Sequence, residues 1–331
     1  MDDQVHLRET QKSGGTDSGD KETHRQVAPL FHCDLEAQPD HLAPKWQVDA
    51  LPPLSLTAEL AISPSVCFGA GGRPDVANRA IYSDRRTAWV TDGGTGITVP
   101  FGLGAASIAE LHGFAWGGTL SPMIAQNLWH AGILVERNTL RRRALEWSRR
   151  VAEARRMFAM GFATLRDFIH PFQLAALRRY YRYQVRVGAF GLGDLQSPLR
   201  YVVHNDPVAR FFHRQLAAAV SDVVGYRLRP SYVYLGAYQP GAQLPRHTDR
   251  RECEITMAVC IDYSPEPDRE TSWPLQLDTH LGLIGIYQAL GDGLIYPGTV
   301  LPHLRGVLPP DCSSTSLFFH FVSVDYDGSL D

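Results

Sequence analysis

Two stretches of this chain each end in polar side chains that can bind a metal ion, and together they limit the folds open to it. The first stretch, from Ser231 to Asp249, reads SYVYLGAYQPGAQLPRHTD. Its alternating β-branched and aromatic residues predict a strand, QPG predicts a turn, and the residues from Leu244 onward predict a second strand. The second stretch, GDGLIYPGTVLPH, ends at His303, which we expect to lie on another strand.

His247 and Asp249 lie two residues apart, so their side chains point to the same face of a pleated strand. His303 arrives from a different strand as a third candidate ligand. Two histidines and one carboxylate on one side of a metal ion leave positions open on the other side, which suits a non-haem Fe(II) that must bind a cosubstrate and O2. These three residues are therefore the predicted metal ligands and the predicted catalytic centre.

An ordered set of features surrounds these ligands. It comprises a strand and helix in GFATLRDFIHPFQLAALRRYYR, Tyr238 ahead of the His-x-Asp pair, the GDGLIYPG turn before His303, and a closing strand, STSLFFHFV. Taken together, residues 157–328 resemble the iron(II)- and 2-oxoglutarate-dependent dioxygenases, in particular their prolyl-hydroxylase-like branch. The ordered set is far more specific than the His-x-Asp pair by itself.

This resemblance implies an α+β chain whose catalytic domain is a double-stranded β-helix, or jelly-roll, with supporting helices. It also implies Fe(II) as the metal, with 2-oxoglutarate and O2 as cosubstrates. The implied activity is hydroxylation of an unactivated C–H bond, with 2-oxoglutarate converted to succinate and CO2. In such a reaction the metal carries the difficult step, while the protein supplies geometry and shielding.

One feature of the family is missing. The prolyl-hydroxylase-like enzymes place an Arg or Lys beyond the distal histidine to pair with the far carboxylate of 2-oxoglutarate, but here that region reads PPDCSSTSLFF and no Lys or Arg follows Arg305. A buried carboxylate without a counter-charge is costly, so another arginine should bind it. Arg305 is the first choice, because it shares the face of His303 if a strand begins there. Arg251, which would continue the face of His247 and Asp249, is the second.

Other side chains are expected around the metal. The hydroxyl groups predicted to add hydrogen bonds to the far carboxylate belong to Tyr238, Ser314, Ser316 and Thr256. Arg246 has the opposite strand parity and is not expected to contribute. The aromatic residues predicted to line a substrate cleft are Tyr232, Tyr234, Trp273, Tyr287 and Phe319. His204 and Asn205 are candidates for the substrate entrance, whereas His213 is expected to be a packed or surface residue of a helix.

The rest of the chain divides by composition. Residues 1–28 are almost wholly polar and predict a disordered tail, and residues 29–54 predict a partly ordered arm. Residues 55–135 predict short strands with Gly-rich turns followed by two helices, a small α+β domain that resembles the winged-helix-like modules that bind leader peptides. Residues 136–156, rich in arginine, predict a linker helix that leads into the dioxygenase domain at 157–331.

Charge and cysteine content narrow the class of protein. A formal net charge of -3 argues against general affinity for nucleic acid or anionic membranes. No apolar run approaches the length of a membrane span, and the polar N-terminus has no signal-peptide core. The 5 cysteines are odd in number and include no CxxC, so neither a disulfide framework nor a zinc site is indicated. These properties predict a cytoplasmic protein.

Two other interpretations stay open. A cupin would use the same β-helix, and Gly241, His247 and Glu252 partly match its metal motif, although it would normally carry a second histidine at the position of Asp249. Alternatively, the chain is a non-catalytic protein that binds nucleic acid or a peptide through its N-terminal module. If the chain is an oxygenase, its substrate is a peptide side chain, a free amino acid or a natural-product intermediate.

Overall fold

The structure is a computed structural model of the whole chain. It describes residues 33–35, 59–68, 87–136, 139–166 and 168–330. Two segments discussed above fall outside these ranges: the predicted tail at 1–28 and most of the predicted arm at 29–54.

Two antiparallel sheets form the C-terminal half of the chain. The strands of the larger sheet are β7 (Ala163–Leu165), β8 (Gly191–Leu192), β9 (Arg200–His204), β10 (Leu228–Tyr238), β12 (Ile255–Ser264), β15 (Gly293–Tyr296) and β17 (Ser313–Ser323). Those of the smaller sheet are β11 (Leu244–His247), β13 (Leu275–Thr279), β14 (Gly282–Ile286) and β16 (His303–Arg305). The larger sheet has the order β7-β15-β12-β17-β10-β9-β8, and the smaller has the order β11-β16-β13-β14.

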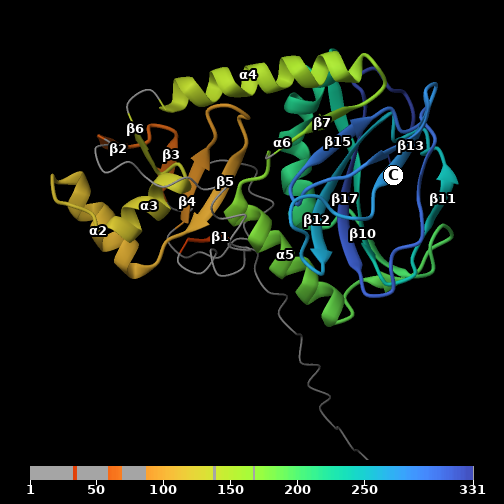
Figure 1. Cartoon of the computed structure of the whole chain (residues 1–331). Helices are drawn as coiled ribbons and strands as arrows, with labels where there is room; N and C mark the ends of the chain where they lie inside the picture. The colour runs from red at the N-terminus through yellow and green to blue at the C-terminus, as the bar shows by residue number, and fades with distance from the viewer. Residues whose placement is uncertain (1–32, 36–58, 69–86, 137–138, 167, 331) are drawn as a thin grey trace, which may run out of the picture.

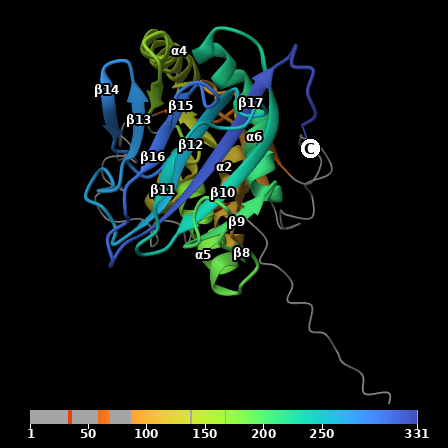
Figure 2. The same cartoon turned by 90° about the vertical axis from the view of Figure 1, so that its right-hand side faces the viewer.

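From β10 to β17 the chain passes back and forth between these two sheets, with the hairpin of β13 and β14 as one step. This alternation is the winding of a double-stranded β-helix. The two sheets face each other in Figures 1 and 2, and a hydrophobic cluster that includes Tyr238, Ala258, Leu275 and Tyr296 fills the space between them. The metal ligands predicted from the sequence lie on or next to β11 and β16 of the smaller sheet.

Side-chain alternation decides what each face of the larger sheet contacts. On β17, Leu317, Phe319 and Phe321 belong to the hydrophobic cluster on the helix-covered face, whereas Phe318 belongs to the cluster between the sheets. Residues two apart share a face, so Ser316 and its even-numbered neighbours also point between the sheets. Ser314, Ser316 and His320 therefore point between the sheets, and Leu317, Phe319 and Phe321 point toward the helices.

Three helices cover the outer face of the larger sheet (Figure 1): α4 (Thr139–Phe158), α5 (Pro171–Arg186) and α6 (Pro207–Val224). The apolar face predicted for α5 is buried as expected, at Phe172, Leu174, Leu177 and Tyr181. The start of α6 is capped by Asp206, whose side chain accepts a hydrogen bond from the Ala209 N–H, and the helix ends at Gly225, whose φ of 91° favours glycine.

The N-terminal part is a small mixed domain. Its strands are β1 (Cys33–Asp34), β2 (Leu60–Ile62), β3 (Val66–Phe68), β4 (Thr87–Thr91), β5 (Thr98–Gly102) and β6 (Leu134–Glu136), and its helices are α2 (Ala105–Ala115) and α3 (Pro122–His130). One sheet has the order β1-β5-β4-β3, and β2 pairs with β6. The succession of strands, two helices and a closing strand agrees with the sequence-based prediction; its likeness to a winged helix stays a prediction.

The two parts of the chain share one core. A single hydrophobic cluster runs from Phe101 in β5 to Phe172 in α5, whose rings lie 6.3 Å apart between centroids. The side chain of Gln215 in α6 accepts a hydrogen bond of 2.7 Å from the Thr98 N–H. Across the top of Figure 1, α4 passes over both parts, and its Arg143 forms an ion pair of 3.8 Å with Asp92. The N-terminal domain is therefore packed against the C-terminal half.

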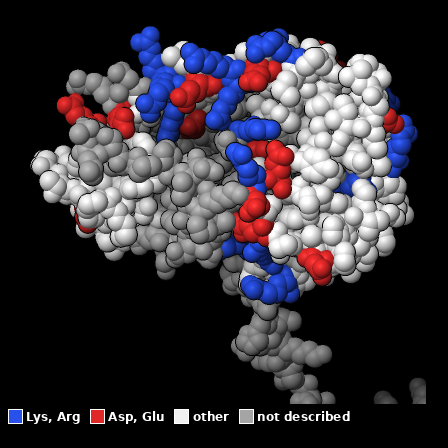
Figure 3. Space-filling model, viewed as in Figure 1, with Lys and Arg blue, Asp and Glu red and all other residues white. Residues whose placement is uncertain are grey.

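The outer face of α4 is highly charged. Figure 3 shows many arginine side chains along this helix together with acidic ones, and the exposed residues include Arg141, Arg142, Arg149, Glu146 and Glu153. Within the described ranges no helix has the length and apolar character that a membrane crossing requires. All 5 cysteines carry free thiols, as their spacing predicts.

Candidate active site

The three predicted metal ligands come together at one end of the smaller sheet. His247 on β11 and His303 on β16 are register partners, and their ring centroids are 4.3 Å apart. Asp249 follows β11 directly. Its Oδ1 lies 3.8 Å from the Nε2 atom of His247 and 3.4 Å from the Nε2 atom of His303. The pairing of β11 with β16 therefore brings these residues close enough to share one ion.

Both histidines are oriented by the backbone. The Nδ1 atom of His247 lies 2.8 Å from the Pro245 carbonyl oxygen, and that of His303 lies 3.0 Å from the Leu301 carbonyl oxygen. A carbonyl can only accept a hydrogen bond, so each Nδ1 carries the proton and each Nε2 keeps its lone pair. Two nitrogen lone pairs and a carboxylate oxygen thus converge, which is a donor set for a metal cation.

The electrostatics agree with this protonation state. Burial, with help from neighbouring His303, lowers the pKa of His247 from its usual value, so the ring stays neutral near pH 7. Burial raises the pKa of Asp249, but the neighbouring His303 and His320 and the hydrogen bond from Thr256 outweigh that effect and bring the pKa to about 2. The site therefore holds a carboxylate next to a neutral His247.

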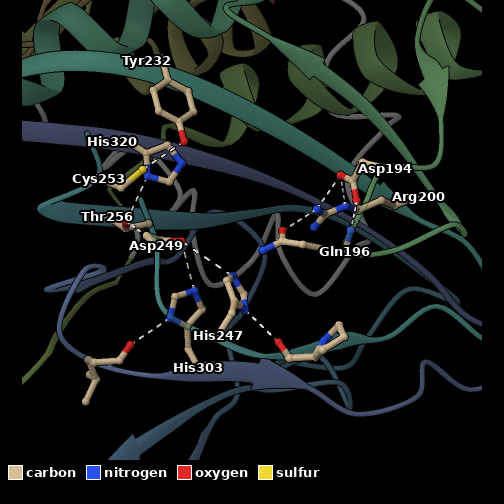
Figure 4. A network of polar contacts seen from close by, with 12 residues as sticks. Asp194, Gln196, Arg200, Tyr232, His247, Asp249, Cys253, Thr256, His303 and His320 are labelled. Atoms are coloured by element: carbon tan, nitrogen blue, oxygen red, sulfur yellow. Dashed lines mark hydrogen bonds and ion pairs between the residues drawn. The ribbon is translucent and has the colours of Figure 1, made fainter. Parts of the chain in front are cut away.

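A chain of hydrogen bonds holds Asp249 from behind (Figure 4). The Thr256 hydroxyl donates to Asp249 Oδ2 at 2.7 Å, and the His320 Nδ1 atom lies 3.0 Å from the Thr256 oxygen. Since that oxygen donates its own proton to the carboxylate, it accepts from His320. The Asp249 N–H also donates to the Gly298 carbonyl at 2.8 Å. With Oδ2 occupied in this way, Oδ1 is left for the metal.

Asp249, Cys253 and His320 form a second group whose ligand atoms lie within 4.8 Å of one another. The Thr256 hydroxyl bonds both Asp249 and His320, and the Tyr232 hydroxyl lies 3.0 Å from the Cys253 sulfur. These polar atoms are already hydrogen-bonded to one another, and burial raises the pKa of the Cys253 thiol to about 12. We therefore infer that this group orients Asp249 and does not bind a second metal ion.

Arg305 lies in the interior between the two sheets and is only 4% exposed. Its Nη1 donates to the Trp273 carbonyl at 2.9 Å, and its guanidinium lies 4.6 Å from the Trp273 ring centroid. Its Nε is buried without a hydrogen-bond partner, and no carboxylate in the described part of the chain forms an ion pair with it. Burial lowers the pKa of Arg305 from its usual value. A buried cation with an unused donor is a site for an anion.

Three hydroxyl residues predicted for this pocket are buried. Ser314 and Ser316 lie on β17, and the Ser316 oxygen has no hydrogen-bond partner. Tyr238, at the end of β10, is fully buried, and its ring centroid is 6.0 Å from the Arg305 guanidinium carbon. The structure thus groups Tyr238 with the candidate anchor Arg305, while Thr256 lies instead behind Asp249.

Several expectations about neighbouring residues were wrong. Arg251 was expected on the inner face of a continuing strand, but β11 ends at His247 and Arg251 is exposed in the turn that follows. Phe319 points to the helix-covered face of the larger sheet because the inner positions of β17 are the even-numbered ones. Tyr287 is 51% exposed and forms no part of the cluster between the sheets, and its place along a substrate cleft stays a prediction.

Other expectations hold. Arg246 points outward and pairs with Asp278 at 2.7 Å. His213 is packed within the core, with its Nε2 atom 2.8 Å from the His320 carbonyl oxygen. His204 is exposed at the end of β9, where its ring lies 4.8 Å from that of Tyr234, and its place at a substrate entrance stays a prediction.

Two residues near the site were not expected from the sequence. His320 occupies an inner position of β17, and the period-two pattern of this strand contains the signal that would have placed it there. Arg200 on β9 is 3% exposed and donates a hydrogen bond of 2.9 Å to the Tyr238 hydroxyl. No spacing rule indicates this contact, because β9 and the end of β10 become neighbours only through the sheet.

Comparison with known proteins gives matches to solved structures only. A scan against protein-family models and a search of curated proteins found no match. A Pseudomonas putida prolyl-4-hydroxylase is similar over 52% of this chain and 98% of its own, with 16% identity and a TM-score of 0.43. AviO1 from Streptomyces viridochromogenes Tue57 is similar over 54% of this chain and 97% of its own, with 20% identity and a TM-score of 0.43. HygX from Streptomyces hygroscopicus, solved with nickel and 2-oxoglutarate bound, is similar over 53% of this chain and 87% of its own, with 13% identity and a TM-score of 0.41.

Proposed function

We propose that this chain is an Fe(II)- and 2-oxoglutarate-dependent oxygenase that hydroxylates an unactivated C–H bond. The observation that carries the proposal is the pairing of two features in one β-helix. His247, Asp249 and His303 converge as a donor set for a metal cation. Arg305, two residues beyond His303 on the same strand, is a buried cation whose Nε has no partner. A ligand that binds the metal at one end and carries a carboxylate at the other suits both features.

The three ligands hold the iron on one side. Bound Fe(II) supplies the activation of O2 and of 2-oxoglutarate that no amino-acid side chain provides. The backbone carbonyls behind His247 and His303 keep both Nε2 lone pairs directed at the ion. The hydrogen bond from Thr256 keeps the Asp249 carboxylate turned toward it. These groups maintain the geometry of the site, with no need to move during turnover.

Arg305 binds the far carboxylate of 2-oxoglutarate. Its position on the inner face of β16 satisfies the strand parity expected for an anchor beside His303. The Ser316 hydroxyl, which is buried without a partner, and the Tyr238 hydroxyl supply further hydrogen bonds to that carboxylate. The surrounding Trp273 and Tyr296 side chains exclude water, which strengthens each of these interactions.

The side chains favour this function over a cupin. A cupin centre relies mainly on histidines, whereas here a carboxylate occupies the second position of the pair and a backbone-oriented histidine completes the set. A nucleic-acid-binding role for α4 also has less support, because Glu146 and Glu153 interrupt its arginines and the chain as a whole has a formal net charge of -3. The oxygenase accounts for both the donor set and the buried Arg305.

We also propose that the substrate is a peptide or amino-acid side chain or a natural-product intermediate. The N-terminal domain, if it recognises a peptide as its predicted winged-helix likeness suggests, would present that peptide from a fixed position, since it packs against the catalytic half through one core. Tyr232 and Tyr234, whose rings contact His204, offer aromatic surface to such a substrate.

The test of the function is cosubstrate turnover. Purified protein incubated with Fe(II), ascorbate and 2-oxoglutarate should release succinate, at a low rate without substrate and faster with a peptide or small molecule that is hydroxylated. His247→Ala should abolish both metal binding and succinate release. If this variant retains the full iron stoichiometry, the ligand assignment is wrong. If the wild-type protein binds metal but never consumes 2-oxoglutarate, the result favours a cupin over an oxygenase.

A further inference from the structure

Arg200 connects the candidate cosubstrate pocket to a surface loop. Its Nε and Nη2 donate to Asp194 Oδ2 at 2.9 and 2.6 Å, and Nη2 also donates to Gln196 Oε1 at 2.9 Å. Its Nη1 donates to the Tyr238 hydroxyl at 2.9 Å. Asp194 and Gln196 belong to the loop of residues 193–199, which joins β8 to β9, whereas Tyr238 lies between the sheets. The buried guanidinium of Arg200 thus hydrogen-bonds to the loop on one side and to Tyr238 on the other.

This contact determines what the Tyr238 hydroxyl can do. The hydroxyl accepts a hydrogen bond from Arg200, so its own proton is available for a second partner. A phenol oxygen that accepts from a cation is a stronger donor, because the two hydrogen bonds polarise each other. Arg200 and Arg305 both lie near the Tyr238 ring, at 5.5 and 6.0 Å from its centroid. The hydroxyl is therefore prepared to donate to an anion bound at Arg305.

The loop end of the network is equally well defined. Asp194 Oδ1 accepts hydrogen bonds from the N–H groups of Gln196 and Ser197 at 2.9 and 2.8 Å, and its Oδ2 accepts from the Tyr234 hydroxyl. Because the Gln196 oxygen bonds Arg200, its amide nitrogen faces the other way, and Figure 4 shows it on the side of His247 and Asp249. The loop thus turns an amide donor toward the side of the metal ligands (Figure 4).

We propose that Arg200 is a positioning residue that couples 2-oxoglutarate binding at Tyr238 to the order of the loop at 193–199. The inference rests on the proposed function and extends it. The far carboxylate of bound 2-oxoglutarate accepts a hydrogen bond from the Tyr238 hydroxyl and fixes its position. The fixed hydroxyl orients Arg200, and Arg200 in turn orients Asp194 and Gln196. The loop then offers the Gln196 amide to a primary substrate that carries a hydrogen-bond acceptor. Because coupling between sites is reciprocal, that substrate tightens cosubstrate binding by the same factor.

A double-mutant cycle tests the first half of the coupling. The readout is 2-oxoglutarate affinity, measured by calorimetry on protein loaded with Ni(II) so that no turnover occurs. Arg200→Gln and Tyr238→Phe should each weaken binding about tenfold, the size of one charge-assisted hydrogen bond. The double variant should bind no more weakly than Tyr238→Phe alone, because Arg200 acts through Tyr238. Additive losses, or an unchanged affinity in Arg200→Gln, would overturn the proposal.

The controls separate this inference from the function itself. If wild-type protein binds Ni(II) but not 2-oxoglutarate, the proposed function fails first. Arg200→Gln leaves Asp194 without its cation and can unfold the protein, so its melting temperature and Ni(II) stoichiometry are measured alongside. Tyr238→Phe removes only a hydroxyl and keeps the test available if Arg200→Gln does not fold.

Hydrogen exchange tests the second half. In Ni(II)-loaded wild-type protein, adding 2-oxoglutarate should slow amide exchange at residues 194–197, and in Tyr238→Phe the same addition should leave exchange there unchanged even at saturating cosubstrate. Protection of the loop in both proteins would show that it orders by another route. The absence of protection in wild-type protein at saturation would show that the loop and the pocket are not coupled. Either result would overturn the proposal.

Discussion

At the scale of single residues, the candidate site depends on two interior charges of opposite sign, one on β16 and one just beyond the paired strand β11. Asp249 is stabilised in its ionised form by neighbours that lower its pKa to about 2. Arg305 is a cation for which the described residues provide no carboxylate, and burial lowers its pKa. Uncompensated buried charge is costly, which is why the structure favours an anionic ligand at this point.

Removing that cation should affect the cosubstrate alone. Hydrogen bonds to a charged partner contribute roughly 1.5–3 kcal/mol each, so Arg305→Ala should weaken 2-oxoglutarate binding by about one to three orders of magnitude while metal stays bound. Arg305→Lys should recover only part of the affinity, because a point charge cannot form the bidentate contact. Calorimetry on Ni(II)-loaded protein measures both variants. Arg251→Ala, at an exposed position, is the control and should bind 2-oxoglutarate like the wild-type protein. Weaker binding in Arg251→Ala with unchanged binding in Arg305→Ala would mean that the anchor is misassigned.

The Thr256 hydroxyl should matter through Asp249. Thr256→Ala removes the donor to Oδ2 and frees the carboxylate to rotate, so we expect metal affinity to fall roughly 10- to 100-fold, the range found when a group that orients a ligand is lost. Thr256→Ser keeps the hydroxyl and should retain most of the affinity. A metal titration followed by competition with a chelator distinguishes the two variants, and equal affinities for Ala and Ser would contradict the role given to this hydrogen bond.

At the scale of elements, the turn between β15 and β16 is as important as the strands it joins. Gly298 in this turn accepts the Asp249 N–H, and a Cβ at this position would lie 2.6 Å from the Thr256 oxygen and 2.8 Å from the Cys253 carbonyl oxygen, besides colliding with the Asp249 carboxylate. The turn can approach the ligand this closely only because it has no side chain there.

Gly298→Ala should therefore damage the metal centre specifically. The added methyl group pushes against Asp249, so metal affinity should fall by at least tenfold while the far-ultraviolet circular dichroism spectrum stays that of a folded protein. Gly306→Ala is the matched control, because a Cβ at that glycine meets nothing within 4 Å. Metal titration of the two variants makes the comparison, and wild-type affinity in Gly298→Ala would show that the turn relaxes without moving the ligand.

At the scale of the whole molecule, buried histidines make the fold sensitive to acid. His213, which is 3% exposed, lies between α6 and β17, and burial lowers its pKa to about 3. In the unfolded chain the same ring titrates near 6.5, so the unfolded state binds more protons between pH 6.5 and 3. The contribution of this residue is present in full above about pH 6.5 and is lost as the pH falls, by at most about 1.4 kcal/mol per pH unit.

His213→Gln should reduce that sensitivity. The amide still donates to the His320 carbonyl but does not titrate, so the difference in the free energy of unfolding between pH 7 and pH 5 should shrink by about 2 kcal/mol. Urea unfolding of metal-free protein at the two pH values measures it, with chelator present so that metal release does not contribute. An unchanged difference would mean that the ring is already protonated in the folded state.

Strand parity explains both what the sequence predicted and what it did not. Parity placed Arg305 beside His303 correctly, because β16 is a regular strand. It failed at Arg251, because the chain leaves β11 at His247 and the next residues turn. It failed again at Phe319, because an aromatic residue was chosen without fixing which face of β17 is inward, and a shift of one residue exchanges the two faces.

Contacts between distant elements were beyond sequence reasoning. Arg200 approaches Tyr238 because β9 lies against β10 in the sheet, and no local pattern encodes that neighbour. His320 approaches Asp249 through Thr256 only once β12 and β17 are paired. Such residues follow from the fold, whereas the metal ligands follow from spacing.

The core shared by the two parts of the chain limits which substitutions can accumulate among homologues. Phe101 of the N-terminal domain packs against Phe172 of α5, and Trp89 of the same domain packs against Phe211 of α6, at 6.3 Å between ring centroids in both cases. A change of side-chain volume in one domain leaves a void or a clash at its partner in the other, so substitutions at these positions are coupled between the two parts. Among homologues we expect the sizes of the residues at 101 and 172, and at 89 and 211, to vary together, and chimaeras that exchange the N-terminal domain alone to fold only when these partners match.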